Sequence, residues 1–545
     1  MFHLAGETVV PNSIIPQSII HSQQLAAATK LSFSVEQNQN AAKYFVDRHG
    51  AGEVASKPAF IETDGANRTL SYGELAAQCA KMAALYEKHG IRREERAAVL
   101  VLDTIEFPII FWGSVKCGVI PVALNTLLGT DVYDTILRDC RARVLFVSEQ
   151  LLPTVKNALA NNPHLDKVFV VGSKCDDYLH FDQELKLCES RPTIEAVADE
   201  CAFWLYSSGS TGKPKGIRHA HESLRATADA YGDKVLGIRQ SDVVFSAAKM
   251  FFAYGLGNAM TFPMSVGATA VLLSGRPTPE AVTDILNKYQ PTVFCGVPTL
   301  YAAMNSLIGS GKRELETKLR RCISAGEALP EDVGTTWERL SGCEILDGVG
   351  STEMLHIFLS NRSGEVVYGT SGQAVDGYEL RLVNDRGNKT KVDELGELLV
   401  NGRSSALDYW NQRDKSRCAF EGKWTRTGDK YTRREDGRFV YCGRTDDMFK
   451  VSGMWVSPFE IEQSLASHAS VLEAAVVAAK DDDGLEKPKA FVVLNEDADS
   501  QTISSELKRH VQSRIGRWKY PRWIEVVDDL PKTATGKIQR FKLRQ

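Results

Sequence analysis

Long uninterrupted apolar runs are missing from this sequence, which argues against a membrane-spanning helix. The first thirty residues contain a single lysine, no arginine and no continuous apolar core, so they resemble neither a mitochondrial presequence nor a secretory signal. The 11 cysteines form no CxxC pair, and this spacing argues against a zinc site and against a disulfide framework. These absences together predict a cytoplasmic protein with reduced thiols.

A strong charge imbalance is also absent. The formal net charge is −4 and the basic residues are scattered, so we expect no nucleic-acid surface, and no membrane partner either. The length of 545 residues exceeds that of one ordinary domain, and a hydrophobic content of 43% is sufficient for a sizeable core. We therefore expect a soluble chain of two or more domains, either a monomer or a homodimer.

Short β-branched segments alternate with amphipathic segments from about residue 40 to residue 396. The expected strands are 97–103, 143–147, 168–171, 268–273, 292–297 and 344–346, and a helix is expected at 105–117. Buried strands that alternate with helices are typical of parallel-rich sheets covered on both faces. The sequence therefore predicts an α/β fold with a large N-terminal body of several subdomains.

The pattern changes after about residue 396, where 396–400 and 438–441 are expected as strands of a more antiparallel region. A smaller unit begins near residue 443, with strands expected at 472–478, 490–494 and 523–527 and a helix at 503–515. Ser457 is expected to cap another helix, with Pro458 in its first turn and Glu460 completing a capping box. We predict an N-terminal extension (1–40), an N-terminal domain (41–445) and a small α+β C-terminal lid (446–545).

A loop at 206–216 is rich in glycine and hydroxyl groups and reads Tyr-Ser-Ser-Gly-Ser-Thr-Gly-Lys-Pro-Lys-Gly. Such a loop presents many donors and lets the backbone approach a ligand closely, as a polyphosphate requires. It is not a Walker A loop, because Pro214 stands where the magnesium-binding hydroxyl should be. The flanking apolar residues predict a strand–loop–strand unit. The alternative is a flexible surface turn.

Five further segments follow this loop in a definite order. They are residues 324–330, 347–353, 427–429, 441–450 and 531–538. Each alone is compatible with an ordinary turn, but the set and its order closely resemble the superfamily of adenylate-forming enzymes, which contains acyl- and aryl-CoA ligases and adenylation domains. The resemblance extends from about residue 40 to the C-terminus, and it implies a large body and a small mobile lid.

The resemblance implies that a carboxylic acid attacks the α-phosphate of ATP, so that positioning and neutralisation of phosphate charge dominate the catalysis. Lys537 would bridge the acid and the α-phosphate, Thr352 would contact the α-phosphate, and Glu353 would hold Mg²⁺ through oxygen. Asp429 would bind the ribose, with Arg444 close by. The other nucleotide-binding residues implied by the resemblance are Ser207, Ser208, Gly209, Ser210, Thr211, Gly212, Lys213, Lys215, Gly326, Glu327 and Asp347.

A second half-reaction is also implied, in which a thiol displaces AMP after the lid rotates about a hinge at Asp446. Rotation would withdraw Lys537 and bring a hairpin of the lid to the active site. The residues expected there, along a coenzyme A tunnel, are Lys450, Ser452, Gly453 and Trp455. A side chain at Gly453 would block the thiol, although the alternative for this residue is an ordinary turn glycine. The expected ligands are therefore ATP, Mg²⁺ and coenzyme A.

Four segments narrow the resemblance to the benzoate–CoA ligase branch, namely 249–258, 261–270, 351–361 and 453–460. The residues that would surround the acid are Phe252, Ala253, Tyr254, Gly326, Gly350, His356 and Ile357. Aromatic and aliphatic walls suit a flat ring, although core packing is the alternative for the aromatic residues. His356 either shapes the pocket as a neutral ring or bonds a ring hydroxyl or amine. His219 and His221 lack a third ligand at metal spacing, so we expect a loop or helix-start pair.

Three functions remain open on this basis. The first is an ATP-dependent aryl-acid–CoA ligase for benzoate or a close derivative such as a hydroxybenzoate or aminobenzoate. The second is an aryl adenylation enzyme that loads a carrier-protein thiol, although no carrier domain is evident in the chain. The third is a silent nucleotide-binding protein, which the complete set of expected catalytic residues disfavours.

Overall fold

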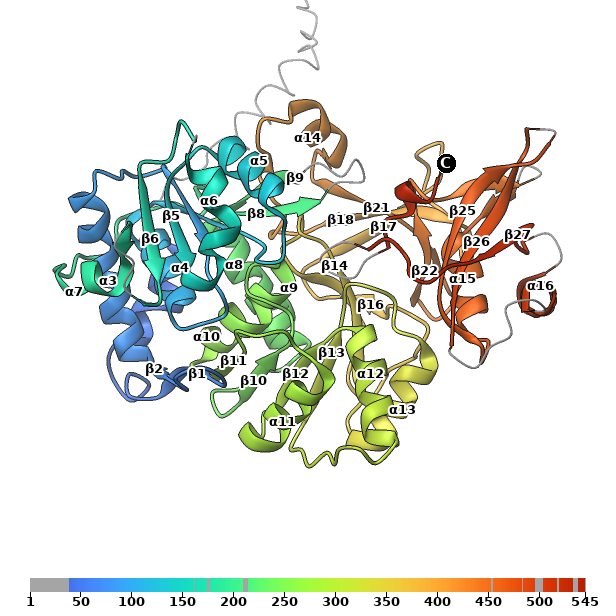
Figure 1. Ribbon diagram of the computed structural model, residues 1–545, viewed down its shortest axis with the longest axis horizontal. Coiled ribbons are helices and arrows are strands. Elements are labelled where there is room, and N and C mark those ends of the chain that lie inside the picture. Colours follow the sequence, from blue (N-terminus) through green and yellow to red (C-terminus); the bar gives the residue numbers. More distant parts are fainter. Residues whose placement is uncertain are drawn as a thin grey trace, which may run out of the picture.

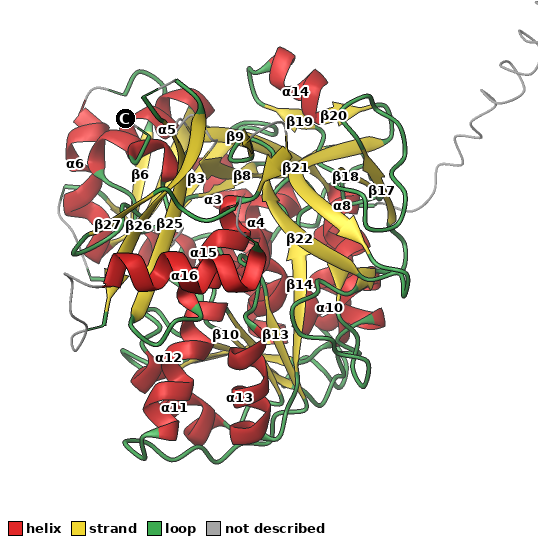
Figure 2. Cartoon of the chain, turned by 90° about the vertical axis from the view of Figure 1, so that its right-hand side faces the viewer, coloured by secondary structure: helices red, strands yellow, loops and turns green. Residues whose placement is uncertain are grey.

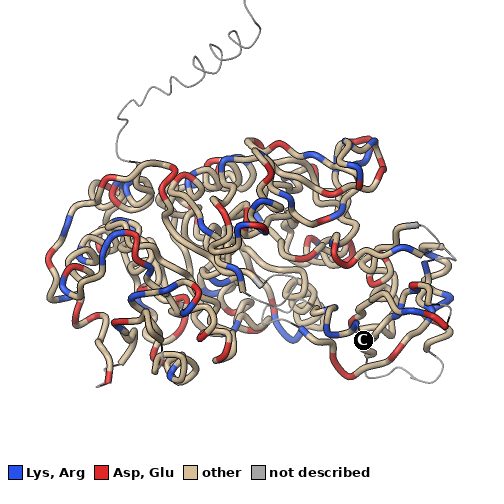
Figure 3. The backbone as a smooth tube through the Cα atoms, turned by 90° about the horizontal axis from the view of Figure 1, so that it is seen from above, with Lys and Arg blue, Asp and Glu red and all other residues tan. Residues whose placement is uncertain are grey.

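The computed structural model describes residues 39–160, 162–173, 177–208, 214–451, 454–482, 484–495, 503–516, 519–532 and 538–544 of the chain. These residues form a large body around three sheets and a small unit at the C-terminal end, which lie at opposite sides of Figure 1. The predicted α/β fold class with a smaller α+β C-terminal unit is confirmed. Acidic and basic residues are interspersed along both parts (Figure 3). None of the helices within the described ranges is long and apolar enough to cross a membrane.

The first sheet has eight strands in the order β19-β9-β8-β4-β3-β5-β6-β7. Its strands are β3 (Arg96–Leu100), β4 (Ile120–Ala123), β5 (Ala142–Ser148), β6 (Lys167–Val171), β7 (Leu179–His180), β8 (Cys201–Ser208), β9 (Pro214–Ala220) and β19 (Asp408–Tyr409). The helices around it are α2 (Ala41–Phe45), α3 (Tyr72–Lys88), α4 (Glu106–Cys117), α5 (Thr130–Cys140), α6 (Leu152–Ala160) and α7 (Phe181–Lys186), with 3-10 turns η1 (Asp47–His49) and η2 (Glu149–Leu151). The strands from β4 to β7 pair in parallel, whereas β8 and β9 form an antiparallel hairpin. The predicted strand–loop–strand unit is therefore confirmed.

The second sheet has nine strands in the order β16-β15-β14-β13-β12-β10-β11-β1-β2. They are β1 (Pro58–Glu62), β2 (Thr69–Ser71), β10 (Val243–Ser246), β11 (Thr269–Leu272), β12 (Val293–Gly296), β13 (Arg321–Ser324), β14 (Ile345–Gly350), β15 (Ile357–Ser360) and β16 (Gln373–Ala374). The associated helices are α8 (His221–Thr227), α9 (Ala253–Leu256), α10 (Phe262–Val266), α11 (Pro279–Tyr289), α12 (Pro298–Gly309) and α13 (Glu331–Ser341), with π-helical turns η3 (Ala228–Asp233) and η4 (Gly257–Thr261). Its central strands pair in parallel, and β12 is buried along its whole length, as the apolar runs predict.

The third sheet is antiparallel, as expected for the region after residue 396. It consists of β17 (Glu379–Val383), β18 (Gly396–Asn401), β20 (Phe420–Glu421), β21 (Trp424–Arg433) and β22 (Phe439–Arg444), and α14 (Arg413–Ala419) precedes β20. The last strand, β22, leads directly into the C-terminal unit. This sheet therefore connects the body with the predicted lid.

The C-terminal unit has its own hydrophobic core and is seen face-on in Figure 2. It contains the hairpin β23 (Phe449–Val451) and β24 (Met454–Val456), the sheet β25 (Val471–Lys480), β26 (Glu486–Leu494) and β27 (Trp523–Val526), helices α15 (Pro458–Ala466) and α16 (Ile503–Ile515), and a 3-10 turn η5 (Arg540–Lys542). The Ser457 hydroxyl accepts the Glu460 N–H at 3.1 Å, so the predicted N-cap is confirmed. The predicted capping box is only half formed, because the Glu460 carboxylate accepts from Lys519 Nζ at 2.6 Å instead.

The predicted N-terminal extension lies outside the described residues apart from Gln39 and Asn40. Asn40 is buried, and its side chain accepts the Ala42 N–H at 3.0 Å and donates to the Val115 carbonyl at 3.0 Å. The next residue, Ala41, donates its N–H to Nδ1 of His221 at 3.1 Å. These contacts attach the start of the described chain to both α4 and α8.

Candidate active site

Several predicted site residues meet at the carboxyl edge of β13 and β14. These two strands are parallel neighbours, and Ser324 pairs with Asp347. The chain then returns antiparallel in β15, where Gly350 pairs with Ile357. A Cβ atom at Gly350 would lie only 2.6 Å from the His356 carbonyl oxygen, so the close pairing of the two segments requires glycine. The strand pairings thus bring the segment that begins at Ser324 next to Asp347, and the segment that begins at Ile357 next to Gly350.

Glu353 lies in a cluster of polar side chains beside the 206–216 loop. Its Oε1 accepts from Lys215 Nζ at 2.9 Å and from the Tyr409 hydroxyl at 2.8 Å. Burial by itself raises the pKa of Glu353, but the Lys215 ammonium and the two hydrogen bonds bring it below its ordinary value. Glu353 is therefore an ionised carboxylate paired with an ammonium group.

Asp429 and Arg444 face each other across β21 and β22. Arg444 donates to Asp429 Oδ1 at 2.9 Å and to the Thr427 carbonyl at 3.1 Å. Gly428 between them has φ +71°, and a Cβ there would lie 3.0 Å from the Arg444 guanidinium. The structure thus places Arg444 next to Asp429, as the sequence predicted, in a turn that requires glycine.

A ring of aromatic side chains surrounds His356. Its imidazole lies 4.5 Å from the Phe262 ring centroid, 5.1 Å from Tyr231 and 5.7 Å from Tyr254. The Tyr254 hydroxyl donates to the Gly296 and Ile323 carbonyls at the ends of β12 and β13. Burial lowers the pKa of His356 to about 3, so the ring is neutral at pH 7.

Two of these aromatic residues were not predicted from the sequence. Tyr231 lies in the π-helical turn η3 and Phe262 opens α10. Phe262 lies within one of the segments that carry the resemblance, whereas Tyr231 belongs to no motif. Gly257 approaches the same imidazole so closely that a Cβ would lie 2.5 Å from His356 Cδ2.

The predicted pocket residues Phe252 and Ala253 lie at the start of α9 and are half-buried. The segment before them is held by Asp103, whose carboxylate accepts the Met250 N–H at 3.2 Å. Lys249 is anchored as well, because its Nζ donates to the Gly275 carbonyl at 2.7 Å. Burial raises the pKa of Asp103 to about 6, although the nearby Lys249 charge opposes that rise. No local sequence signal identified Asp103, because its contacts are made across 147 residues.

The remaining predicted site residues within the described ranges differ in their exposure to solvent. Gly326 and Glu327 are exposed in the turn after β13, where Gly326 has φ +100°. Asp347 is buried in β14, and burial raises the pKa of its carboxyl well above the ordinary value. Ser207 in β8 pairs with Lys215 in β9 at the base of the loop. Thr352 is half-buried immediately before Glu353.

The predicted hinge and coenzyme A residues lie where β22 ends and the C-terminal unit begins. Asp446 follows β22, and its carbonyl accepts from Arg544 at 3.3 Å. Lys450 pairs with Trp455 across the β23–β24 hairpin, and its ammonium lies 4.7 Å from the Trp455 ring centroid. Their placement at the joint between body and lid is compatible with the predicted rotation.

Some predicted residues fall outside the described part of the chain. They are Gly209, Ser210, Thr211, Gly212 and Lys213 of the loop, Ser452 and Gly453 of the hairpin, and Lys537. The side chain of Ser208 is also not described. The roles expected for these residues stay predictions.

His219 and His221 contact neighbouring elements of the fold. The His219 ring is buried in β9 and stacks on Phe203 with centroids 5.0 Å apart. Burial lowers the pKa of His219 to about 4, against the charge of nearby Glu353. His221 begins α8 and accepts the Ala41 N–H, so the expected helix-start position is confirmed for His221. The expectation of a loop or helix start is wrong for His219, which lies in strand β9.

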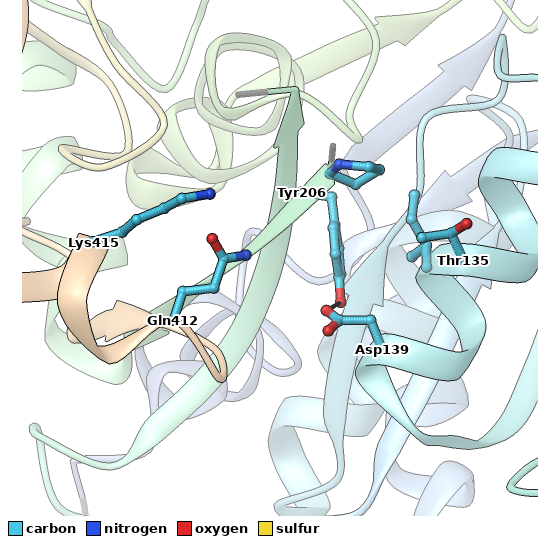
Figure 4. A pocket seen from close by; sticks show the side chains of 7 residues that line it. Thr135, Asp139, Tyr206, Gln412 and Lys415 are labelled. Atoms are coloured by element: carbon cyan, nitrogen blue, oxygen red, sulfur yellow. Dashed lines mark hydrogen bonds between the residues drawn. The ribbon is translucent and has the colours of Figure 1, made fainter. Parts of the chain in front are cut away.

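A cavity of about 330 Å³ lies beside the base of the 206–216 loop (Figure 4). Its lining residues are Thr135, Ile136, Asp139, Tyr206, Pro214, Gln412 and Lys415. The Tyr206 hydroxyl donates to Asp139 Oδ2 at 2.5 Å, which ties β8 to α5. Sequence analysis did not predict this cavity, because it joins α5, the hairpin and α14 from distant parts of the chain.

Family models and known proteins match most of this chain. The family of AMP-binding enzymes matches residues 47–410, and the C-terminal domain of AMP-binding enzymes matches residues 460–537. The chain is 53% identical to a 4-hydroxybenzoate–CoA/benzoate–CoA ligase of Rhodopseudomonas palustris, over 93% of this chain and 94% of that protein. It is 49% identical to a benzoate–CoA ligase of Thauera aromatica, over 95% and 98% of the two chains.

Solved structures are similar over the same range. A benzoate CoA ligase from Burkholderia xenovorans superposes with a TM-score of 0.85 at 45% identity, covering 93% of this chain and 100% of that one. An anthranilate CoA ligase in complex with anthranoyl-AMP superposes with a TM-score of 0.87 at 40% identity, covering 93% and 96%.

Proposed function

We propose that this chain, which belongs to the AMP-binding enzyme family, is an ATP-dependent ligase that joins benzoate or a close derivative to coenzyme A. The acid would first attack the α-phosphate of ATP to form an acyl-adenylate and pyrophosphate. The thiol of coenzyme A would then attack the acyl carbon and release AMP. Relatives with this activity in their names cover nearly the whole chain, which supports the proposal.

The observation that carries the proposal is the position of Glu353 beside the 206–216 loop. Lys215 at the end of that loop pairs with Glu353 across 138 residues of sequence. A cation and a carboxylate side by side at the base of a donor-rich loop suit a magnesium-bound polyphosphate, whose charge must be held and neutralised. Neither group would need to stay buried and unpaired before the nucleotide binds.

Glu353 is the residue that would hold magnesium. A hard cation such as Mg²⁺ prefers carboxylate oxygen, and beside a nucleotide it commonly takes one or two protein carboxylates. The ionised Glu353 carboxylate fits this requirement. When bound, the ion would neutralise phosphate charge. Lys215 would bind phosphate oxygens, and Asp429, held by Arg444, would accept hydrogen bonds from the ribose hydroxyls.

We infer that the acid lies in the pocket around His356. Neutral aromatic walls favour a flat, uncharged ring, and a neutral imidazole adds no cation that would select a second carboxylate. Lys537 would then bridge the acid carboxylate and the α-phosphate during the first step. The second step would follow rotation of the lid (446–545) about Asp446, which would bring Lys450, Gly453 and Trp455 to the thiol.

The first experiment is a measurement of AMP release from ATP and Mg²⁺ across a panel of acids, with and without coenzyme A. The panel holds benzoate, its hydroxy, amino and fluoro derivatives, cinnamate, acetate and hexanoate. AMP release that requires both an aromatic acid and coenzyme A would support the proposal and rank the ring substituents. Turnover of chain acids alone would refute the pocket assignment. Aromatic turnover that coenzyme A does not accelerate would favour a carrier-protein thiol as acceptor.

A further inference from the structure

Tyr409 is the residue of the active-site cluster that no motif contains. Its hydroxyl donates to Glu353 Oε1 at 2.8 Å, and the Lys215 ammonium lies 3.1 Å from that hydroxyl and 4.1 Å from the ring centroid. One side chain therefore contacts both the carboxylate and the cation of the cluster. The hydroxyl bonds the carboxylate, and the ring face attracts the ammonium.

The segment that carries Tyr409 is attached to the Glu353 turn by its backbone as well. The Ala406 N–H donates to the Glu353 carbonyl at 2.7 Å, and the Ser404 hydroxyl donates to the Met354 carbonyl at 2.8 Å. Both contacts come from residues only a few positions before Tyr409. The segment therefore follows any displacement of the Glu353 turn.

Tyr409 itself is held rigidly on the other side. It pairs with Ile217 in β9, directly after the 206–216 loop, and its N–H donates to the Ser416 hydroxyl at 3.0 Å. Its ring contacts Phe420 at a centroid distance of 5.2 Å and is 6% exposed. A side chain fixed in this way is suited to hold the orientation of a neighbouring carboxylate.

We propose that Tyr409 is a positioning residue that orients the Glu353 carboxylate toward the metal ion of the bound nucleotide. The inference rests on the proposed metal-holding role of Glu353. Oε1 of Glu353 accepts one hydrogen bond from the Lys215 ammonium and one from the uncharged Tyr409 hydroxyl. The hydroxyl thereby serves the nucleotide step, whereas the ring packs against Phe420 and the Lys215 ammonium.

The test separates the hydroxyl from the ring with Tyr409→Phe in the full chain. Mn²⁺ replaces Mg²⁺ as a spectroscopic probe, and its affinity is measured by electron paramagnetic resonance in the presence of a non-hydrolysable ATP analogue. We expect binding roughly 10- to 100-fold weaker, the usual effect of removing a hydrogen bond that orients a metal-ligating group. Tyr86→Phe is the matched control, because it removes another buried hydroxyl, which contacts Ser114 at 2.6 Å.

A half-reaction assay gives an independent readout. Thioester formation from preformed benzoyl-adenylate and coenzyme A needs no metal-bound polyphosphate, so Tyr409→Phe should retain it within about threefold while AMP release from ATP requires more Mg²⁺. Unchanged Mn²⁺ affinity would overturn the proposal. Equal losses in both half-reactions would also overturn it, since they would indicate a packing role.

A double-mutant cycle distinguishes an effect of Tyr409 through Glu353 from a general defect in folding. Tyr409→Phe added to Glu353→Gln should change Mn²⁺ affinity no further, because Tyr409 acts through Glu353, and an additive loss would contradict this. The metal measurement needs no acid. If the wild-type chain releases no AMP with any acid, the proposed function fails, whereas the Mn²⁺ measurement still tests the Tyr409 inference by itself.

Discussion

Arg540 offers a test of whether the C-terminal end of the chain around Lys537 serves only the first of the two proposed half-reactions. It lies three residues after Lys537 and donates to both oxygens of Glu462 on α15, at 2.9 and 2.6 Å, and to Asp447 at 3.3 Å. Glu462 in turn accepts the Val476 N–H of β25 at 2.7 Å. The side chains of Arg540 and Glu462 are 20% and 9% exposed, so the pair is shielded from water.

Arg540→Ala should impair adenylation selectively. Removing one partner of a buried ion pair costs about 3–5 kcal/mol, and partial exposure reduces this to about 2–3 kcal/mol here. If the whole loss is felt in the adenylation transition state, the rate falls roughly 30- to 150-fold. Thioester formation from preformed adenylate should stay within about threefold, since Lys537 is expected to be withdrawn during that step.

The assay compares pyrophosphate release with thioester formation in single-turnover experiments. Arg540→Lys keeps the charge but loses the bidentate contact with Glu462. Its rate of pyrophosphate release should therefore lie between those of wild type and Arg540→Ala. Arg509→Ala is the matched control, because within the described part of the chain this exposed residue on α16 donates only to the Ser505 carbonyl, at 3.4 Å. A protein that melts as wild type does but loses both half-reactions equally, or neither, would refute the reasoning.

Three further predictions follow from the acid pocket and the lid. Gly257→Ala places a Cβ 2.5 Å from His356 Cδ2, so the ring must shift by about 1 Å, and we expect a roughly tenfold loss of kcat/KM for benzoate with an unchanged KM for ATP. The pKa of Asp103 is raised from 3.8 to about 6 by burial, so its contribution to stability is present at low pH and is lost as pH rises through about 6. Asp103→Asn should remove that dependence, about 2 kcal/mol between pH 4 and pH 7, and urea unfolding of both proteins at these pH values measures it. Gly453→Leu should retain pyrophosphate release and lose thioester formation by at least roughly a hundredfold; loss of both in a folded protein would contradict a thiol tunnel there.

Local patterns were sufficient to predict much of the fold. The helix expected at 503–515 is found as α16, and the strand–loop–strand unit at 206–216 is the β8–β9 hairpin, because period and turn chemistry are encoded within each segment. Strand order was a different matter, since β1 pairs with β11 through Phe60 and Ala270, which lie far apart in the sequence, and no local window contains that pairing. The half-formed capping box has the same origin, because Lys519 competes for Glu460 from 59 residues away.

The candidate site likewise contains residues that local sequence patterns identify and residues that they do not. Residues such as Glu353 and Asp429 stand in recognisable segments, because the ligand chemistry requires particular side chains in a particular order. The residues that contact them need only lie close to them in the folded structure. Tyr409 reaches Glu353 from 56 residues away through an edge strand of two residues, and sequence analysis did not identify it.

Among the described site residues, Glu353 pairs with Lys215 and Asp429 pairs with Arg444, and this has a physical reason. A carboxylate as buried as Glu353 would be costly without Lys215 and Tyr409, just as Asp429 would be without Arg444. A nucleotide that recruits Lys215 leaves Glu353 in need of another cation, which a divalent metal would supply. Metal and nucleotide affinity are then coupled through one carboxylate, and a neutral donor such as Tyr409 holds it without competing for its charge. Under the proposed function, residues outside the recognisable segments would therefore determine how strongly the affinities for metal and nucleotide depend on each other.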